Sequence, residues 1–346
     1  MKRLAIVTGL AAAAAAVLAV VYERRMLAAP HYRGVESDHF DGERFHNHQS
    51  GWQTEASFLK WQMNREPGRW REWVDASAGP LPPPRVDEGG LRVTFVNHAT
   101  TLVQMDGVNI LTDPIWSDRC SPVSFAGPKR HRPPGTRFED LPKIDVVLIS
   151  HNHYDHLDLP TLRMLQQKHD PMIITPLGNS ALMTRGGVRG ARELDWWGAA
   201  DPGGVRITAV PGQHFSARAI SDRNCNLWGG FVISGPSGHV YFAGDTGWGK
   251  HFAEVSAKFG PMRLAILPIG AYMPRWFMKP AHISPDEAVD AHQALKAGTS
   301  VAIHFGTFNL GDDGETQPVE DLNRAIAAKG NPRFWVLDFG EGRDVP

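Results

Sequence analysis

The chain has 346 residues, of which 42% are hydrophobic and 21% are charged, and its formal net charge at pH 7 is −1. This composition excludes a disordered protein, and the balanced charge argues against the positive field that drives nucleic-acid binding, so we expect no nucleic-acid partner. Two cysteines, Cys120 and Cys225, are too few for a disulfide framework and form no Cys-x-x-Cys pair, so both are predicted to be structural thiols.

The N-terminal 29 residues differ from the rest of the chain. After two basic residues, an apolar run spans residues 4–22, and three charged residues follow it at 23–25. The run is long enough to cross a bilayer as a helix, since about 17 to 25 apolar residues suffice. We expect residues 1–29 to anchor the protein to a membrane, although a signal segment cleaved near Ala28-Ala29 is the alternative and would place the protein in the periplasm. The basic residues on the two flanks are nearly balanced, which leaves the side of the membrane open.

Residues 30–90 are rich in Trp, Arg, Glu and Pro, and they end in a stiff run of three prolines at 82–84. We expect a helical or irregular extension that packs on the main domain. Its aromatic residues Phe58, Trp61, Trp70 and Trp73 have a spacing that indicates a helix packed against a core more than it indicates a binding face.

The main domain is predicted over residues 91–346, where short β-rich segments begin. Strands are predicted at 91–96, 101–105, 108–111, 146–149, 205–210, 240–243, 264–267 and 301–303. The clearest helix is predicted over 285–297, with Ser284 as its N-cap and Gly298 as its stop. Strands followed by helices indicate an α/β protein in which helices cover the sheets.

A dense cluster of potential metal ligands follows the predicted strand 146–149. His151, His153, Asp155 and His156 form a His-x-His-x-Asp-His motif directly after this apolar segment. Zinc binds imidazole nitrogen and carboxylate oxygen, and neighbouring ligands in a tight loop can be divided between two ions. A single histidine in a polar loop is usually an ordinary residue, but this cluster predicts a metal site.

Three further candidates follow other predicted strands. His214 comes after 205–210, Asp245 lies in a Gly-Asp-Thr-Gly segment after 240–243, and His304 comes directly after 301–303. Each of these histidines taken alone would more often be an ordinary core or surface residue. The repeated placement at strand ends predicts instead that the candidates converge on one cleft.

These motifs resemble those of the metallo-β-lactamase superfamily, whose fold is a four-layer αββα sandwich with metals at the strand ends. More narrowly, the chain resembles the N-acylphosphatidylethanolamine-hydrolysing phospholipase D family. The resemblance covers roughly residues 38–340 and is clearest at 111–114, 121–122, 127–130, 194–197, 228–231 and 303–308. It implies a zinc-dependent phosphodiesterase of phospholipase D type, which converts N-acyl phosphatidylethanolamine-like phospholipids to N-acylethanolamine and phosphatidic acid.

The resemblance also implies roles for individual residues around two zinc ions. One ion would be held by His151, His153 and His214, and the other by Asp155, His156 and His304, while Asp245 and a hydroxide would bridge both. The candidate catalytic residues are Asp155, Asp245 and His282. Of these, His282 matches a family position near the substrate phosphate, and a helix-capping or supporting role is its alternative.

Weaker signals have two interpretations each. Asp113 orients a metal ligand or caps a turn, and the basic run 129–132 meets phospholipid head groups or is a solvated loop. Trp196 and Trp197 line an acyl groove, although one of two adjacent strand residues is expected in the core. The segment 273–278, with two methionines, a tryptophan and a phenylalanine, forms an apolar rim or packs in the core.

Three competing functions remain to be compared with the phospholipase. A lactonase or a small phosphate-ester hydrolase of the same superfamily is the alternative that shares the ligand pattern. The near-neutral charge argues against a nuclease, and the complete ligand set argues against a non-catalytic scaffold. The N-terminal apolar run and the Trp-rich segments favour a phospholipid substrate and contact with a membrane surface. Whether the chain forms a homodimer is left open.

Overall fold

The computed structural model describes residues 23–49 and 55–346. The apolar run 4–22, and with it most of the predicted anchor or signal, lies outside these residues. Within the two described ranges, no helix combines the length and the apolar character that a membrane span requires.

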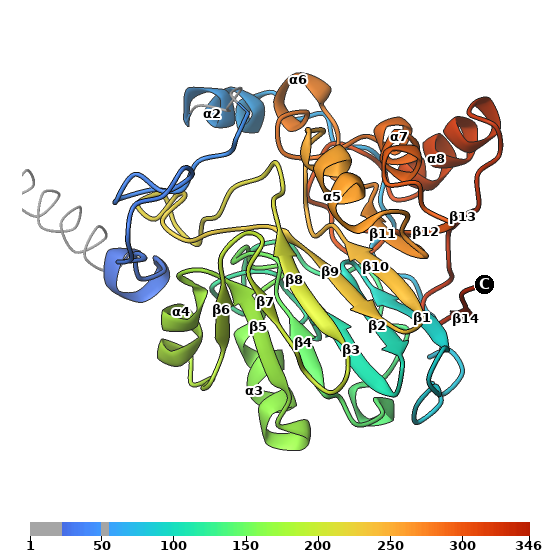
Figure 1. Ribbon diagram of the computed structural model, residues 1–346. Helices are drawn as coiled ribbons and strands as arrows, with labels where there is room; N and C mark the ends of the chain where they lie inside the picture. Colours follow the sequence, from blue (N-terminus) through green and yellow to red (C-terminus); the bar gives the residue numbers. More distant parts are fainter. Residues whose placement is uncertain (1–22, 50–54) are drawn as a thin grey trace, which may run out of the picture.

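The first half of the main domain and the C-terminal strand β14 form one seven-stranded mixed sheet (Figure 1). Its strand order is β14-β1-β2-β3-β4-β5-β6, antiparallel from β14 to β3 and parallel from β3 to β6. The strands are β1 (Leu91–Asn97), β2 (Thr100–Met105), β3 (Val108–Thr112), β4 (Val146–Leu148), β5 (Met172–Pro176), β6 (Arg192–Leu194) and β14 (Gly342–Asp344).

The second half forms another seven-stranded mixed sheet with the same plan. Its order is β7-β8-β9-β10-β11-β12-β13, antiparallel from β7 to β10 and parallel from β10 to β13. The strands are β7 (Ala199–Ala200), β8 (Arg206–Val210), β9 (Gly230–Gly235), β10 (Gly238–Phe242), β11 (Leu264–Pro268), β12 (Thr299–Ile303) and β13 (Phe334–Trp335).

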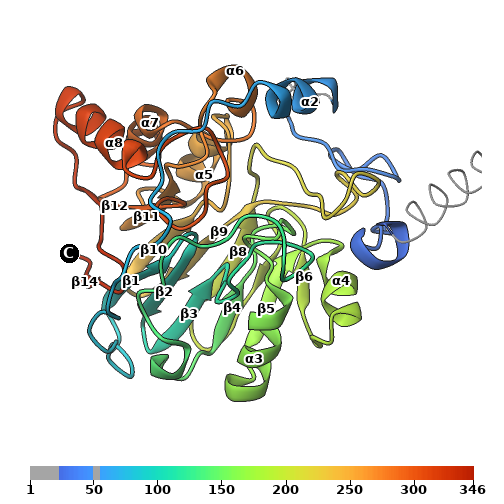
Figure 2. The same ribbon diagram turned by 180° about the vertical axis from the view of Figure 1, so that it is seen from behind.

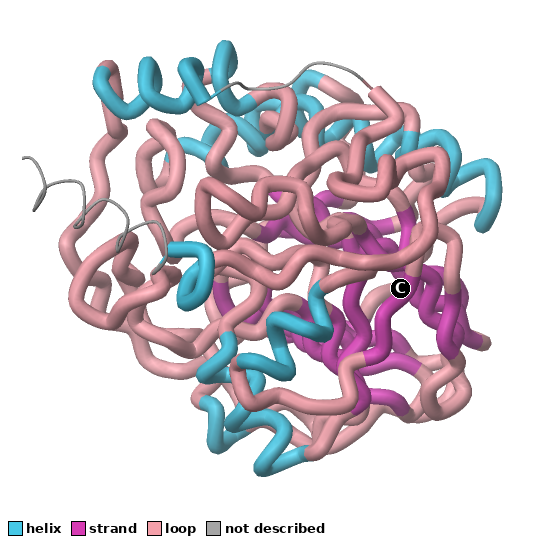
Figure 3. The backbone as a smooth tube through the Cα atoms, turned by 90° about the vertical axis from the view of Figure 1, so that its left-hand side faces the viewer, coloured by secondary structure: helices cyan, strands magenta, loops and turns pink. Residues whose placement is uncertain are grey.

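Helices cover the outer face of each sheet, so that the two strand layers lie between two helical layers (Figure 3). Helices α3 (Leu159–His169) and α4 (Asn179–Arg185) pack on the first sheet. The second sheet is covered by α5 (His251–Phe259), α7 (Pro285–Ala294) and α8 (Gln317–Ala328). The remaining helices are short: η1 (Glu23–Leu27), α2 (Glu55–Met63), η2 (Phe138–Asp140) and α6 (Arg275–Met278).

The alternation of apolar side chains along the strands produces these layers. In β4, Val146 and Leu148 point into the core between the sheets, whereas Val147 and the following Ile149 pack under α3 and α4. Both faces of this strand are therefore buried, which is typical of a parallel strand covered on both sides and explains why its sequence is continuously apolar. The predicted αββα architecture of the main domain is confirmed.

All eight predicted strands are present, with ends that differ by at most two residues from the prediction. The predicted N-cap of α7 is also confirmed: the Ser284 hydroxyl accepts a hydrogen bond from the Glu287 N–H, and the Glu287 carboxylate accepts one from the Ser284 N–H. The predicted C-terminal end is wrong. The helix stops at Ala294, and the left-handed residue that reverses the chain is Lys296 with φ of 50°, not Gly298.

The extension before β1 is only partly helical. Phe58 and Trp61 lie in α2, but Trp70 and Trp73 lie in extended chain, so the helical spacing predicted across all four is wrong for the last two. Pro67 and Gly68 intervene, and proline disfavours helical conformation in the residue before it. Figure 2 shows this segment leaving α2, passing α6 and descending to β1.

Candidate metal centre

The loop after β4 carries four of the predicted ligands, and it is fixed from both sides. Asp113, directly after β3, accepts hydrogen bonds from the Ser150 N–H at 2.7 Å and the Ser150 hydroxyl at 2.5 Å. On the other side, Arg218 donates to the carbonyl oxygens of Asn152 and Leu157 at 3.1 and 2.9 Å. The ligand loop is therefore held at its start and along its backbone by residues that are not predicted ligands.

Three histidines converge at one end of the site. His151 Nε2 lies 2.8 Å from His153 Nδ1, and His214 Nε2 lies 3.3 Å from the same atom. The other ring nitrogens of His151 and His214 are occupied, because His151 Nδ1 pairs with the Ser150 hydroxyl at 2.9 Å and His214 Nδ1 donates to the Ala281 carbonyl at 2.9 Å. Ligand nitrogens around a tetrahedral zinc ion with bonds of about 2.0–2.1 Å lie about 3.3 Å apart, so this spacing suits a metal ion.

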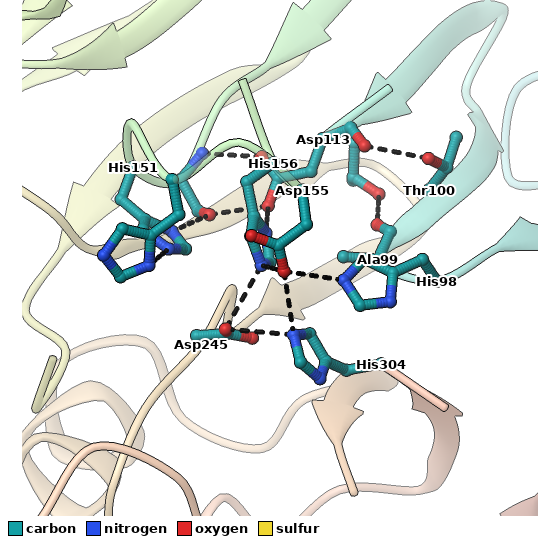
Figure 4. A network of polar contacts seen from close by, with 12 residues as sticks. His98, Ala99, Thr100, Asp113, His151, Asp155, His156, Asp245 and His304 are labelled. Atoms are coloured by element: carbon teal, nitrogen blue, oxygen red, sulfur yellow. Dashed lines mark hydrogen bonds and ion pairs between the residues drawn. The ribbon is translucent and has the colours of Figure 1, made fainter. Parts of the chain in front are cut away.

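A second group, made of Asp155, His156 and His304, lies beside the first (Figure 4). Asp155 Oδ2 is 3.2 Å from His156 Nε2 and 3.4 Å from His304 Nε2. Asp245 Oδ2 is 3.1 Å from the same nitrogen of each histidine and 4.0 Å from His214 Nε2, which belongs to the first group. Asp245 thus lies between the two groups, in the place that a bridging carboxylate would occupy.

The donor atoms of this centre fit bound cations. His156 Nε2 and His304 Nε2 are buried and lie 3.1–3.4 Å from carboxylate oxygens of Asp155 and Asp245, while Asp245 Oδ1 is buried without a hydrogen-bond partner in the described part of the chain. Buried polar atoms in proteins almost always have a partner, so an unpaired carboxylate oxygen beside two imidazole nitrogens indicates an ion-binding site. The imidazole and carboxylate groups are also the ligands that zinc and similar divalent ions take.

Burial and charge divide the histidines into two classes. Burial lowers the pKa of His153 and of His214 to about 3 and lowers that of His151 well below its ordinary value, so all three are neutral at pH 7. Burial also acts on His304, but Asp245 and Asp155 more than offset it and raise the pKa of His304 to about 9. The same two carboxylates, with Asp113, raise the pKa of His156 well above its usual range.

Left-handed backbone at three strand ends aims side chains into the site. His98 after β1, Asp113 after β3 and His304 after β12 have φ of 44°, 31° and 64°. Non-glycine residues in this region cost on the order of 1–3 kcal/mol each and tend to cluster at functional sites. The His304 turn also requires a glycine opposite, because a Cβ on Gly270 would lie 1.9 Å from the His304 carbonyl oxygen.

Two supporting residues hold the ligands in place. Asp113 Oδ2 accepts from His156 Nδ1 at 2.7 Å, which directs His156 Nε2 at the centre, as the predicted orienting role of Asp113 requires. His98 Nε2 lies 2.8 Å from Asp155 Oδ2 and was not predicted. A signal was available, since His98 lies two residues after the predicted strand 91–96, close to the position that His304 has after its own strand.

A third supporting residue, Asn47, comes from the extension. Its side chain donates to the His214 carbonyl at 2.8 Å and accepts from the His214 N–H at 3.1 Å. The same amide oxygen accepts from the Trp228 ring N–H at 3.2 Å. These partners are far away in the sequence, so no local pattern indicated that Asn47 fixes a ligand.

A cavity of about 480 Å³ opens onto the centre. Its lining includes five polar residues at the metal centre, and its walls are mainly apolar. The five are His153, Asp155, Asp245, His282 and His304. The wall residues include Phe58 and Trp61 of α2, Phe277 and Met278 of α6, and Ile220 and Leu310. Of the segment 273–278, Phe277 and Met278 line the cavity and also pack with Trp61 in a small buried cluster, so both predicted interpretations apply to them.

His282 lies at this cavity, with Nδ1 3.8 Å from Asp245 Oδ2. Ser284, not His282, caps α7, which removes the helix-capping alternative. Burial lowers the pKa of His282 to about 3, so its imidazole is neutral at pH 7.

Two weaker predictions are not supported by the described residues. Trp196 is buried and stacks on His39, with 4.4 Å between ring centroids, and Trp197 lies in a turn with φ of 68°. Neither tryptophan is among the described residues that line the cavity. In the basic run, Arg130 is 2% exposed and donates to the Ser117 carbonyl, while Arg132 pairs with Glu315. Of these three cations, Lys129 is exposed and Arg132 is partly buried.

Comparison with known proteins agrees with this geometry. The model of the beta-lactamase superfamily domain matches residues 108–305. A metallo hydrolase of Ignicoccus hospitalis has the same fold, with a TM-score of 0.55 and 22% identity over 74% of this chain and 98% of its own. A metal-dependent hydrolase of Methanopyrus kandleri is 31% identical over 256 residues, which cover 72% of this chain and 98% of that protein. Fold and site together define a metal-dependent hydrolase of the metallo-β-lactamase superfamily.

A more specific relative is the N-acyl-phosphatidylethanolamine-hydrolyzing phospholipase D 1 of Caenorhabditis elegans. It is 41% identical over 270 residues, which cover 73% of this chain and 76% of the relative. Within the superfamily, the chain belongs to the family of the N-acyl-phosphatidylethanolamine-hydrolysing phospholipases D.

Proposed function

We propose that the protein is a zinc-dependent phosphodiesterase that hydrolyses N-acyl phosphatidylethanolamine-like phospholipids to N-acylethanolamine and phosphatidic acid. The observation that carries this proposal is the apolar cavity that ends at the two groups of ligands. Such a cavity suits the acyl chains of a lipid whose phosphate meets the metal centre. The 41% identity with the phospholipase of C. elegans supports the same substrate class.

The ligand groups would hold two zinc ions, one with His151, His153 and His214, and one with Asp155, His156 and His304, with Asp245 shared. Bound there, the ions would supply Lewis acidity toward the phosphate oxygens and lower the pKa of a nearby water. In the hydrolysis, a water oxygen bonds to phosphorus, the bond from phosphorus to the N-acylethanolamine oxygen breaks, and that oxygen takes a proton.

The chain's own residues orient this reaction. Neutral His282 faces both Asp245 and the cavity, so its ring can hydrogen-bond a phosphate oxygen beside the centre. The apolar walls exclude water from the acyl end, which strengthens the electrostatic interactions at the floor. Exposed apolar residues near the cavity, including Phe58 and Trp276, suit contact with a membrane surface.

The test combines metal analysis with a substrate panel. We expect about two zinc ions per chain, and N-acylethanolamine with phosphatidic acid as products from N-acyl phosphatidylethanolamine in mixed micelles. Asp245→Ala should keep the fold, lose metal and lose at least a thousandfold in kcat/KM, equivalent to about 4 kcal/mol. Turnover of lactones alone, or full activity without metal, would contradict the proposal.

A further inference from the structure

The first described residues are bonded mainly to one loop of the main domain, and the Arg25 carbonyl also accepts from Arg185 of α4. The Glu23 carboxylate accepts from the Ser221 N–H at 3.0 Å and from its hydroxyl at 2.9 Å. The Ala29 N–H donates to the Asp222 carboxylate at 2.5 Å. We call residues 23–32 the stalk and residues 216–226 the wall loop.

Further contacts make the stalk part of the folded domain. The Asn226 amide donates to the Pro30 carbonyl at 2.9 Å, and the Tyr32 N–H donates to the Cys225 carbonyl at 3.0 Å. Ala28 and Ala29, the predicted cleavage site, are only 4% and 3% exposed. In the folded chain, Glu23 and Ala29 are thus both bonded to the wall loop on either side of this site.

The wall loop is in turn fixed to the metal centre. Arg218 binds two carbonyls of the ligand loop, as described above, and its guanidinium lies 3.6 Å from the centroid of the Tyr154 ring. Asp222, which accepts from Ala29 of the stalk, also accepts from the N–H groups of Arg218 and Ala219. A continuous set of hydrogen bonds therefore runs from the stalk through the wall loop to the ligands.

Exposed apolar side chains lie on both sides of the cavity near this loop. Ile220 of the wall loop lines the cavity and is 80% exposed. Phe58 and Leu59 of α2 also line it and are 48% and 60% exposed, and Trp276 beside them is 54% exposed. Apolar side chains gathered at the rim of a pocket indicate a surface that contacts another apolar body.

We propose that the stalk and the wall loop form a rigid bracket, which holds the rim of the cavity against the lipid bilayer that the apolar run 4–22 enters. The bilayer is the partner that fits, because this run has the length of a membrane span and ends at Glu23, the residue bonded to the wall loop. Exposed Arg24 and Arg25 follow directly and suit anionic head groups. The proposal rests on the proposed function only for the lipid nature of the substrate.

Depth-dependent quenching tests the contact without any turnover. The full chain carrying Ile220→Cys, labelled with bimane, is reconstituted in vesicles of phosphatidylcholine and phosphatidylglycerol with brominated acyl chains. The native Cys120 and Cys225 are buried, so the label reports position 220. Met172→Cys is the matched control, since Met172 is 40% exposed at the start of β5, away from the ligand-bearing strand ends. We expect strong quenching at 220 and little at 172.

A pair of substitutions tests the bracket itself. Glu23→Ala with Ser221→Ala removes the bond between stalk and wall loop, so the chain should stay with the vesicles but lose most of the quenching at 220. Glu36→Ala, an exposed acidic residue of the same extension, is the control and should change nothing. Metal content and melting temperature verify that each variant is folded.

The outcomes separate this proposal from the proposed function. Three results would overturn the bracket: equal quenching at 220 and 172, no quenching in a vesicle-bound chain, or a rim that a second copy of the chain covers. Full quenching in the Glu23 and Ser221 double variant would also overturn it. Quenching as expected without release of N-acylethanolamine would contradict only the proposed substrate.

Discussion

At the scale of single residues, the metal centre depends on groups that are not ligands. Asp113 binds both Ser150, where the ligand loop starts, and His156, where it ends. One carboxylate therefore sets the position of the loop and the ring orientation of a ligand.

This role predicts the effect of Asp113→Asn. An amide has the same shape, but its NH2 group would face a donor on one side, so either His156 or Ser150 loses its acceptor. We expect zinc affinity to fall about 10- to 100-fold, as is typical when a supporting carboxylate is removed. Competition with a chelating dye measures the affinity. Asp201→Asn, an exposed residue paired with Arg206, is the control and should leave it unchanged.

The two classes of histidine predict how pH affects metal loading. In the chain without metal, His304 with a pKa of about 9 and His156 with a raised pKa carry protons at pH 7, whereas His151, His153 and His214 are neutral. Metal binds neutral imidazole, so the ion at His156 and His304 must displace protons and the other ion need not.

We therefore expect one binding step to release protons and to strengthen as pH rises toward about 9, while the other hardly changes between neutral and mildly acidic pH. Calorimetric titration in two buffers with different ionisation enthalpies measures the protons released in each step. Two steps without proton release would show that His156 and His304 are already neutral.

How much of the site could be predicted also depends on single residues. The ligands were found because each follows an apolar strand, and both sheets bring such strand ends to one edge. Asn47 could not be found, because its partner His214 is 167 residues away and its own segment has no regular structure. Nothing in the sequence distinguishes buried Arg130 from exposed Lys129 beside it, since only the tertiary fold covers one of them.

At the scale of elements, α2 forms a wall of the cavity although it lies outside the main domain. Trp61 is 6% exposed, and its ring stacks on Phe277 of α6 at 4.9 Å between centroids. Its ring N–H donates to Asp312 at 3.2 Å. This contact joins the extension to the short helix on the other side.

Trp61→Ala should separate α2 from α6 and widen the cavity. We expect KM for a long-chain phospholipid to rise about tenfold, equivalent to about 1.4 kcal/mol, with a small change in kcat because the ligands are untouched. Steady-state kinetics on mixed micelles measures both. Trp73→Ala is the matched control, being a tryptophan of the same extension that is 44% exposed and lies in extended chain. An equal loss in both variants would contradict the role of α2.

Regular elements were predictable where local chemistry decides them. The strands around the ligands are continuous apolar runs, and the Ser-x-x-Glu pattern at 284–287 specifies the start of α7. The two-residue strands β7 and β13 exist only because they pair with β8 and β12, so no local preference reveals them. In the extension, local chemistry decided against the prediction. The aromatic residues have helical spacing, but Pro67 lies between Trp61 and Trp70 and prevents one continuous helix.

At the scale of the whole molecule, the ligands come from both halves of the chain. The first sheet supplies His151, His153, Asp155 and His156, and the second supplies His214, Asp245 and His304. Bound metal would therefore link the two sheets, and its removal should lower the stability of the entire domain.

Chelation should leave a folded but less stable protein. Without metal, Asp155 and Asp245 still face the protonated His156 and His304, which replaces part of the lost attraction. Metal at about 1,000 times its Kd contributes about 4 kcal/mol, so we expect the melting temperature to fall on the order of 10 °C. Calorimetry before and after chelation measures it. Zinc should restore the value and magnesium should not, because magnesium prefers oxygen ligands. No change on chelation would indicate that metal does not join the halves.

The matching plan of the two sheets has one more consequence. Aligned by their order, β1 corresponds to β8 and β3 to β10, so the residue pairs that follow these strands are His98 with His214 and Asp113 with Asp245. Each pair has the same residue type. His214 and Asp245 are predicted ligands, whereas His98 and Asp113 hydrogen-bond to ligand residues. The two sheets thus share one plan and carry the same residue types in different roles at these two places, whereas the ligands after β4 and β12 have no counterpart after β11 and β5.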